Sequence, residues 1–206
     1  MLKRVFDATC AFLGLVVLSP VLGLVALMVK ASDRGPVFYR GLRTGLSGRV
    51  FRMLKFRTMV VDAEKSGVTA TADDDPRVTR IGRFLRKYKL DELPQLVNVL
   101  VGDMSLVGPR PEVPQYTAPF TEEEQAILGV RPGITDWTTL WDIAEGEVLA
   151  GSDDPERVYL EKIRPEKIRL QLEYVREHTF GKDVKIILLT LWALITRRKV
   201  IHRLHR

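Results

Sequence analysis

The feature that most constrains this chain is an uncharged apolar run near its N-terminus. Residues 8–29 contain no acidic or basic side chain, and Asp7 and Lys30 bound them. About 22 residues, at a rise of about 1.5 Å each, are enough for a helix to cross the hydrocarbon core of a bilayer once. The run is therefore typical of a transmembrane helix, a signal peptide, or a helix that enters one leaflet and returns. Its length and Lys30 argue against the signal peptide.

The residues within and around the run favour a re-entrant helix. Pro20 lacks an amide hydrogen and bends a helix, while the neighbouring Ser19 hydroxyl can satisfy a carbonyl that is left free. Basic side chains flank the run on both sides: Lys3, Arg4, Lys30, Arg34, Arg40 and Arg43. Because Lys and Arg are retained on the cytoplasmic side, both ends are expected to lie there. A helix-break-helix hairpin allows this arrangement, whereas a straight span does not.

A second stretch, residues 80–111, places two neighbouring acids between two predicted helices. Apolar residues recur at helical spacing before the acids, at Ile81, Phe84, Leu85 and Tyr88, and after them, at Leu93, Leu96, Val97 and Leu100. Pro94 falls in the first turn of the second helix, where a missing amide hydrogen costs little. Asp91 and Glu92 are therefore expected at the N-terminus of that helix.

The position of this acidic pair suits an anionic substrate, because the N-terminus of a helix is the positive end of its dipole. Basic residues precede the pair: Arg80, Arg83, Arg86 and Lys87. Neighbouring residues on a helix point about 100° apart. Asp91 and Glu92 would then do separate tasks, one attacking or transferring a proton and the other holding a metal ion. An ordinary acidic first turn is the simpler explanation of the pair taken alone.

The charge balance indicates a negatively charged partner. The 206 residues include 32 Lys and Arg against 26 Asp and Glu, a net charge of +6. Such a charge suits nucleic acid, a phosphorylated substrate or anionic lipid. Basic and apolar residues interleave in residues 33–59, where Gly-Pro and Ser-Gly turns separate short runs typical of strands or of short amphipathic pieces. This part is either a solvated basic loop or a surface that lies against lipid headgroups.

Two later segments extend these predictions. Arg110 stands between Pro109 and Pro111, whose fixed backbone angles pre-aim its guanidinium group. Residues 183–192 form an apolar stretch that is too short to span a bilayer and ends at Trp192, before a basic tail. This pattern favours a helix that lies on the membrane interface, and an ordinary core helix remains the alternative.

Five short motifs follow one another along the chain: KFRTM at 55–59, LDELPQLVNVL at 90–100, GDMS at 102–105, VGPRP at 107–111 and RPGIT at 131–135. They resemble the bacterial sugar transferase family, the monotopic polyprenyl-phosphate phosphoglycosyl transferases. With the apolar segment, the resemblance covers almost the whole chain. It implies an α+β, mainly helical, monotopic membrane protein. A re-entrant hairpin at 1–32 and a cytoplasmic catalytic domain with interfacial amphipathic helices at 33–206 would form one functional unit.

The resemblance also implies an enzyme on the cytoplasmic face of the bacterial inner membrane. Such an enzyme moves a phospho-sugar from a UDP-sugar to undecaprenyl phosphate and releases UMP, the first membrane step in the assembly of O-antigen, capsule, exopolysaccharide or glycoprotein. The implied route is covalent, with Asp91 as the nucleophile, Glu92 as a second catalytic residue, and both acids binding Mg²⁺ or Mn²⁺. The implied contacts to the phosphates or the nucleotide are Lys55, Arg86, Arg110, Arg131 and Asp183.

The expected partners are a UDP-sugar, undecaprenyl phosphate and anionic membrane lipids, with no nucleic acid, and a homodimer is compatible with the sequence. After RPGIT the chain continues with Asp136 and Trp137, where many members of the family have glycine. The variant segment 136–151 would line the sugar side of the pocket, so the resemblance does not imply which sugar is used. The alternative function is a membrane-tethered basic binding or scaffold protein without catalysis.

Overall fold

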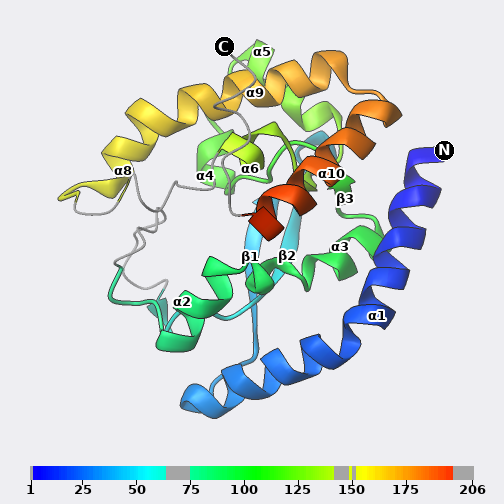
Figure 1. Cartoon of the computed structure of the whole chain (residues 1–206). Coiled ribbons are helices and arrows are strands. Elements are labelled where there is room, and N and C mark those ends of the chain that lie inside the picture. The colour runs from blue at the N-terminus through cyan, green and yellow to red at the C-terminus, as the bar shows by residue number, and fades with distance from the viewer. Residues whose placement is uncertain (1, 64–74, 142–148, 150–151, 197–206) are drawn as a thin grey trace.

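The computed structural model describes residues 2–63, 75–141, 149 and 152–196, and the chain is mainly helical, as predicted (Figure 1). The long helix α1 (Leu2–Asp33) runs down one side of the molecule and along its base. Helices α8 (Pro155–Val158) and α9 (Arg164–Glu177) lie on the opposite side. The strands and the shorter helices lie between these two sides.

Helix α1 remains helical through Ser19 and Pro20, and it bends between its two ends (Figure 1). Pro20 has no amide hydrogen to donate to the carbonyl of Val16, and the Ser19 hydroxyl donates to that carbonyl instead, at 2.8 Å. Proline is a usual cause of a bend in a helix, so Pro20 accounts for this one. The structure therefore shows one bent helix, where the sequence predicted two helices separated by a break.

Both ends of α1 are attached to the rest of the chain. Near the N-terminal end, the carboxylate of Asp7 is buried and accepts a hydrogen bond from the Ser105 hydroxyl at 2.7 Å. At the C-terminal end, Asp33 forms an ion pair with the buried Arg57. Both anchors belong to the same folded unit, so both ends of α1 are held against that unit.

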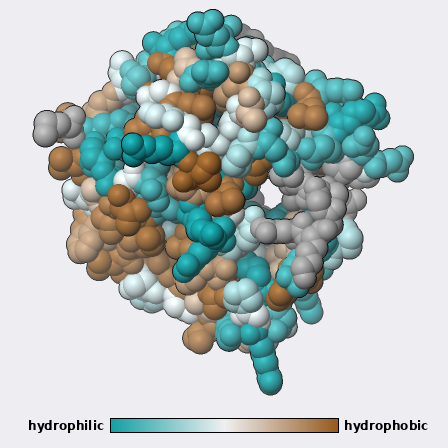
Figure 2. Space-filling model, turned by 180° about the vertical axis from the view of Figure 1, so that it is seen from behind, coloured by the Kyte–Doolittle hydropathy of each residue, from teal (hydrophilic) through white to brown (hydrophobic). Residues whose placement is uncertain are grey.

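Between these anchors, α1 exposes an apolar face. Its exposed large side chains are Phe12, Leu13, Val16, Val17, Val21, Leu24 and Leu27. Figure 2 shows a hydrophobic area on the side of the molecule where α1 lies. Among the described residues, α1 is the one helix that is long and apolar enough to cross a membrane. This finding agrees with the prediction of a membrane-associated N-terminal segment.

Strands β1 (Phe38–Thr44) and β2 (Val50–Phe56) form an antiparallel hairpin, so the short runs in residues 33–59 are strands rather than short amphipathic pieces. The chain reverses where Ser47 and Gly48 adopt positive φ angles of 54° and 75°. Met53 packs in a buried cluster with Ala11 of α1. Lys55 lies two residues further along β2, on the same face of the hairpin as Met53. The inner face of the hairpin therefore carries Lys55 toward the interior.

Two short helices flank the acidic pair, as the apolar periodicity predicted. Helix α2 (Arg80–Lys87) is capped by Thr79, whose hydroxyl accepts a hydrogen bond from the Gly82 amide at 2.9 Å. Helix α3 (Gln95–Val101) follows Pro94 and ends at Gly102, where φ is 100°. The acids lie between the helices, on the short 3₁₀ turn Leu90–Glu92.

The buried face of α3 differs from the predicted apolar face. Gln95, Asn98 and Val99 are buried, whereas Val97 is exposed and Leu96 is half-buried. The reason is that α3 packs between two partners. The Asn98 side chain accepts from the amide of Leu54 and donates to the carbonyl of Arg52, both at 2.9 Å, which ties α3 to β2. The predicted apolar side meets α1 instead, where Leu96 and Leu100 join the cluster around Ala11.

A short parallel pair brings the VGPRP and RPGIT motifs together. Strand β3 (Ser105–Val107) pairs with β4 (Gly133–Thr135). A Cβ atom on Gly108 would lie 2.3 Å from the carbonyl oxygen of Arg131, so glycine is required for this close approach. Short elements occupy the chain around the pair: α4 (Pro114–Thr117), α5 (Glu122–Gln125), the 3₁₀ turn Ala126–Gly129, and α6 (Trp137–Trp141).

The C-terminal helices complete the described chain. A π-helical turn, Tyr159–Ile163, joins α8 to α9, and α10 (Phe180–Thr196) follows. Helix α10 has both a buried and an exposed apolar side, and its predicted place on the membrane interface stays a prediction. Its exposed large side chains are Phe180, Leu188, Leu191, Trp192, Leu194 and Ile195. The predicted basic tail at 197–206 lies outside the described residues.

Candidate active site

Glu92 lies between two cations that come from distant parts of the chain. Its carboxylate accepts from Lys55 Nζ on β2 at 2.8 Å and from the Arg110 guanidinium group at 2.7 Å. Only 9% of Glu92 is exposed. Burial alone would raise the pKa of this carboxyl, but the charges of Arg110 and Lys55 outweigh burial and hold the pKa of Glu92 well below its usual range. Glu92 is therefore a fixed anion that positions both cations.

Asp91 is buried but is left without such a partner. It is 7% exposed, and among the described residues no group donates a hydrogen bond to its Oδ1 atom. Burial raises the pKa of Asp91; the charge of Lys55 opposes this rise, and the charge of Glu92 adds to it. An unpaired carboxylate with a raised pKa is more basic than usual. Asp91 is therefore available for chemistry in a way that Glu92 is not.

The turn that carries the two acids explains why both point inward. Lys89 precedes it with a positive φ of 55°, which reverses the chain after α2. The three residues Leu90–Glu92 then form a single 3₁₀ turn against β2. The sequence predicted the acids in the first turn of an α-helix. The tighter 3₁₀ turn instead buries two neighbouring side chains at once, each in a different environment.

Arg86 approaches Asp91 from helix α2. Its Nε atom donates to the hydroxyl of Thr58 at 3.0 Å, and its charge lowers the pKa of Asp91, opposing the effect of burial. Helix α2 rests directly on the backbone of Thr58, because a Cβ atom on Gly82 would lie 1.9 Å from the Thr58 carbonyl oxygen. Thr58 of the KFRTM motif is thus in contact with α2, the helix that precedes the acidic pair, and this contact sets the position of Arg86.

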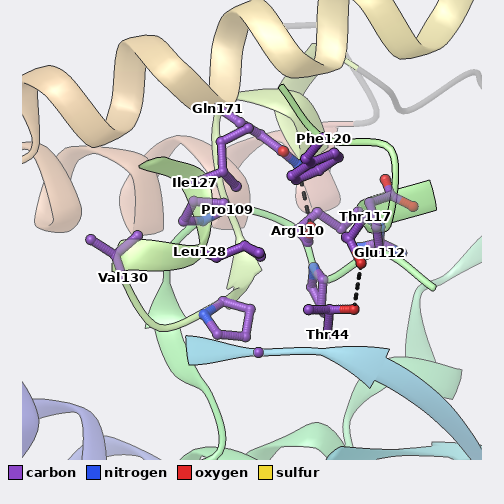
Figure 3. A pocket seen from close by; sticks show the side chains of 13 residues that line it. Thr44, Pro109, Arg110, Glu112, Thr117, Phe120, Ile127, Leu128, Val130 and Gln171 are labelled. Atoms are coloured by element: carbon purple, nitrogen blue, oxygen red, sulfur yellow. Dashed lines mark hydrogen bonds between the residues drawn. The ribbon is translucent and has the colours of Figure 1, made fainter. Parts of the chain in front are cut away.

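Arg110 is fixed through its own backbone. The Arg110 amide donates to Oδ2 of Asp136 at 3.2 Å, and the Arg110 carbonyl accepts from Nε2 of Gln171 on α9 at 3.3 Å. Figure 3 shows the Gln171 side chain reaching down from α9 to this turn. The neighbouring Pro109 carbonyl accepts from the Gly133 amide at 3.0 Å. The guanidinium group therefore extends toward Glu92 from a backbone that is held at several points.

The structure does not bring Arg131 and Asp183 to the acidic pair. Arg131 is exposed, and its Nε atom donates to the carbonyl of Gly102 at 3.0 Å. Asp183, only 2% exposed, pairs with Lys3 of α1 at 2.7 Å and accepts from the Tyr174 hydroxyl at 2.7 Å. Asp183 thus ties α10 to the start of α1. The substrate-binding roles of Arg131 and Asp183 stay predictions.

Four residues near the site were missed by the motif-based predictions: Thr58, Gln95, Asp136 and Gln171. Gln95 follows Asp91 by one helical turn, and its Nε2 atom is buried without a partner among the described residues. A glutamine inside an otherwise apolar helical run was the available signal for it. The sequence showed Asp136 only as a departure after RPGIT. For Gln171, on an amphipathic helix far along the chain, no signal was present.

The described residues contain no group of three or more His, Cys, Asp or Glu side chains that could hold a metal ion. The unpaired Oδ1 of Asp91 is nevertheless a hard oxygen ligand of the kind that magnesium prefers. One or two carboxylates commonly hold this ion together with substrate phosphates. The site therefore fits a magnesium ion that arrives with a phosphorylated substrate. As a whole it offers an unpaired carboxylate beside several cations, an arrangement suited to attack on a phosphorus atom.

Comparisons with known proteins identify the family of the chain. The sequence pattern of the family described as "Bacterial sugar transferase" matches residues 1–197. The chain belongs to the bacterial sugar transferase family. The match includes α1 and every segment that contributes to the acidic site, so the family assignment covers both the apolar helix and the site.

Named relatives of this bacterial sugar transferase act on undecaprenyl phosphate. The chain is 43% identical over 196 residues to the undecaprenyl-phosphate glucose phosphotransferase of Komagataeibacter xylinus, covering 92% of this chain and 35% of the relative. It is 40% identical over 195 residues to the UDP-glucose:undecaprenyl-phosphate glucose-1-phosphate transferase of Escherichia coli (strain K12), and the match covers 93% of this chain and 40% of that relative. A Caulobacter vibrioides protein of that same name is 38% identical, and the match covers 94% of this chain and 70% of that relative. The chain thus spans less than half the length of the first two relatives.

Proposed function

We propose that this chain transfers a phospho-sugar from a UDP-sugar to undecaprenyl phosphate, giving undecaprenyl-diphospho-sugar and UMP. The observation that carries the proposal is the contrast within the acidic pair: Glu92 is held by Lys55 and Arg110, while Asp91 is buried with an unpaired oxygen. The substrate classes follow the names of the relatives. Such a transfer would start glycan assembly on a lipid carrier.

The proposed reaction proceeds by two displacements at one phosphorus atom. A carboxylate oxygen of Asp91 forms a bond to the phosphorus that carries the sugar. The bond from that phosphorus to the bridging oxygen breaks, and UMP leaves with that oxygen and the bonding electrons. An oxygen of the lipid phosphate then attacks the same phosphorus, the bond to Asp91 breaks, and the carboxylate is restored.

The surrounding cations make this attack feasible. An anionic nucleophile and an anionic diphosphate repel each other unless positive charge lies between them. Lys55 and Arg110 are held by Glu92, the neighbour of Asp91 in the sequence, and the charges of Lys55 and Arg86 act on Asp91 itself. A magnesium ion held by Asp91, Glu92 and the diphosphate oxygens would neutralise the charge that develops on the leaving phosphate.

The attachments of α1 support a re-entrant arrangement in the membrane. Asp7 and Asp33 anchor opposite ends of the helix to one folded unit, while the middle of the helix exposes an apolar face. A straight span would carry one of these anchors to the far side of the bilayer and break it. We therefore propose that α1 enters one leaflet and returns, with the site at the cytoplasmic face of the inner membrane and anionic lipids beneath it.

Cysteine labelling in intact cells tests this topology. Single cysteines at Leu2 and Ser32, each in a Cys10→Ser background, are expected to resist a membrane-impermeant reagent until the cells are opened. Labelling of position 2 from outside, with position 32 protected, would show an ordinary single span and refute the re-entrant arrangement.

A screen for UMP release tests the catalytic proposal. Purified protein in undecaprenyl-phosphate vesicles with Mg²⁺ is offered a panel of UDP-sugars that begins with UDP-glucose, the donor named for two relatives. We expect UMP release with at least one donor, and its loss with Asp91→Asn or a chelator. The absence of UMP release with every donor would favour the alternative, a basic membrane-tethered scaffold.

A further inference from the structure

We propose that Asp136 is a positioning residue that aims the Arg110 guanidinium group at the substrate phosphate. Asp136 stands where the chain departs from the RPGIT motif, and its side chain contacts the backbone of Arg110 rather than the acidic pair. The proposal rests on the proposed function, because the direction of Arg110 matters only if that residue binds a phosphate.

The two carboxylate oxygens of Asp136 have different partners. Oδ2 accepts from the Arg110 amide at 3.2 Å. Oδ1 accepts from the Thr138 hydroxyl at 2.6 Å and from the amide and hydroxyl of Thr139 at 2.8 and 3.0 Å. The Oδ1 contacts cap the start of α6 and prevent the carboxylate from rotating. Because Asp136 is only 1% exposed, water does not compete for the Oδ2 bond.

The other side of Arg110 is held by Gln171. Its Nε2 atom donates to the Arg110 carbonyl at 3.3 Å, and the side chain is 1% exposed. Figure 3 shows both residues at the lining of the pocket that includes Pro109 and Phe120. Asp136 and Gln171 thus hold the amide and the carbonyl of one residue, and they come from separate segments of the chain.

This double attachment limits the positions that the guanidinium group can reach. Pro109 and Pro111 restrict the backbone on both sides of Arg110, and the two hydrogen bonds place that backbone relative to β4 and α9. The side chain then extends to Glu92, with 2.7 Å between its Nη2 atom and the carboxylate. A displacement of about 1 Å at such a group can lower a rate by about 100-fold. Loss of the Asp136 bond is expected to act through this displacement.

The test is a double-mutant cycle between Asp136→Ser and Arg110→Lys. The serine hydroxyl can still cap α6 by accepting from Thr139, but it is too short to reach the Arg110 amide. We expect Asp136→Ser to lower kcat/KM for UMP release by about 10- to 100-fold. In the Arg110→Lys background it should cost less than about threefold, because a flexible ammonium group depends less on an aimed backbone. Thr190→Val, which removes a partly buried hydroxyl contact with Thr135, is the matched control and should match the wild type.

Equal losses in the two backgrounds would overturn the proposal, because Asp136 would then act independently of Arg110. If Asp136→Ser does not yield a folded protein, judged by elution and thermal melting, Gln171→Leu takes its place in the same cycle and the same rule applies. Failure of the proposed function itself would be seen separately, as an absence of UMP release by the wild-type protein.

Discussion

Replacing Gly82 with alanine tests whether the contact between α2 and Thr58 determines the position of Arg86 at the candidate active site. A Cβ atom at Gly82 would lie 1.9 Å from the Thr58 carbonyl oxygen, whereas ordinary contact begins near 3.4 Å. Helix α2 would therefore have to move by about 1.5 Å, and Arg86, four residues further along this helix, would move with it. Alanine favours a helix by up to about 1 kcal/mol over glycine, but overpacking costs about 1–3 kcal/mol. We expect a small net loss of stability and a fall in kcat/KM of about 10- to 100-fold.

Gly181→Ala is the matched control for this prediction. Gly181 also lies in a helix, α10, and a Cβ atom there would meet nothing within 4 Å. This variant should melt at or above the temperature of the wild type and keep its activity. Thermal melting in vesicles and UMP release are measured for both variants. The reasoning is refuted if Gly82→Ala melts and turns over like Gly181→Ala, because α2 could then shift without disturbing the site.

Three further predictions concern the acidic pair and its cations. Asp91→Asn should abolish UMP release while the protein still folds and binds vesicles, since an amide cannot act as the attacking oxyanion; turnover in a preparation free of deamidated protein would remove Asp91 as the nucleophile. Glu92→Gln should lose most activity and require more Mg²⁺ for half-maximal rate, and an unchanged Mg²⁺ titration would place the metal elsewhere. Arg110→Lys should lose nearly as much activity as Arg110→Ala, because an ammonium group cannot reproduce the planar guanidinium fork; a nearly normal lysine variant would show that charge alone matters there.

Much of the fold could be predicted because its signals are local. The uncharged run of α1 and the apolar periods of α2 and α3 each lie within one continuous segment. The turns in residues 33–59 were also visible, but the sequence left open whether strands or short amphipathic pieces lie between them. The pairing of β3 with β4 could not be predicted in the same way. Each strand has three residues and the partners lie 28 residues apart in sequence, so neither alternation nor a turn signal marks them. The need for glycine at Gly108 and Gly133 can be recognised only in the folded chain, where the two backbones lie against each other.

The candidate site also combines features that the sequence indicates locally with features that depend on the folded chain. The motifs pointed to Lys55, Asp91, Glu92 and Arg110, and the structure brings these residues together. The sequence could not show that Glu92 takes both cations while Asp91 keeps an unpaired oxygen, because this depends on a 3₁₀ turn that buries the two acids differently. Nor could it show that Asp183 pairs with a lysine 180 residues away.

The distribution of unpaired polar atoms gives an independent argument for where the chemistry lies. Among the described residues, three buried side-chain atoms have no hydrogen-bond partner: Oδ1 of Asp91, Nε2 of Gln95 and Oε1 of Gln171. An unpaired buried polar group typically costs about 1–3 kcal/mol, so a fold usually pairs or replaces it. Here one belongs to the acidic pair, one follows that pair by a helical turn, and one is on the side chain that holds the Arg110 backbone. Two are acceptors and one is a donor: a phosphate oxygen can accept from the donor, and a cation or a water molecule can meet the acceptors. The free-energy cost of unpaired polar atoms therefore falls on the acidic pair and on residues associated with it or with Arg110, where a bound ligand could pair these atoms.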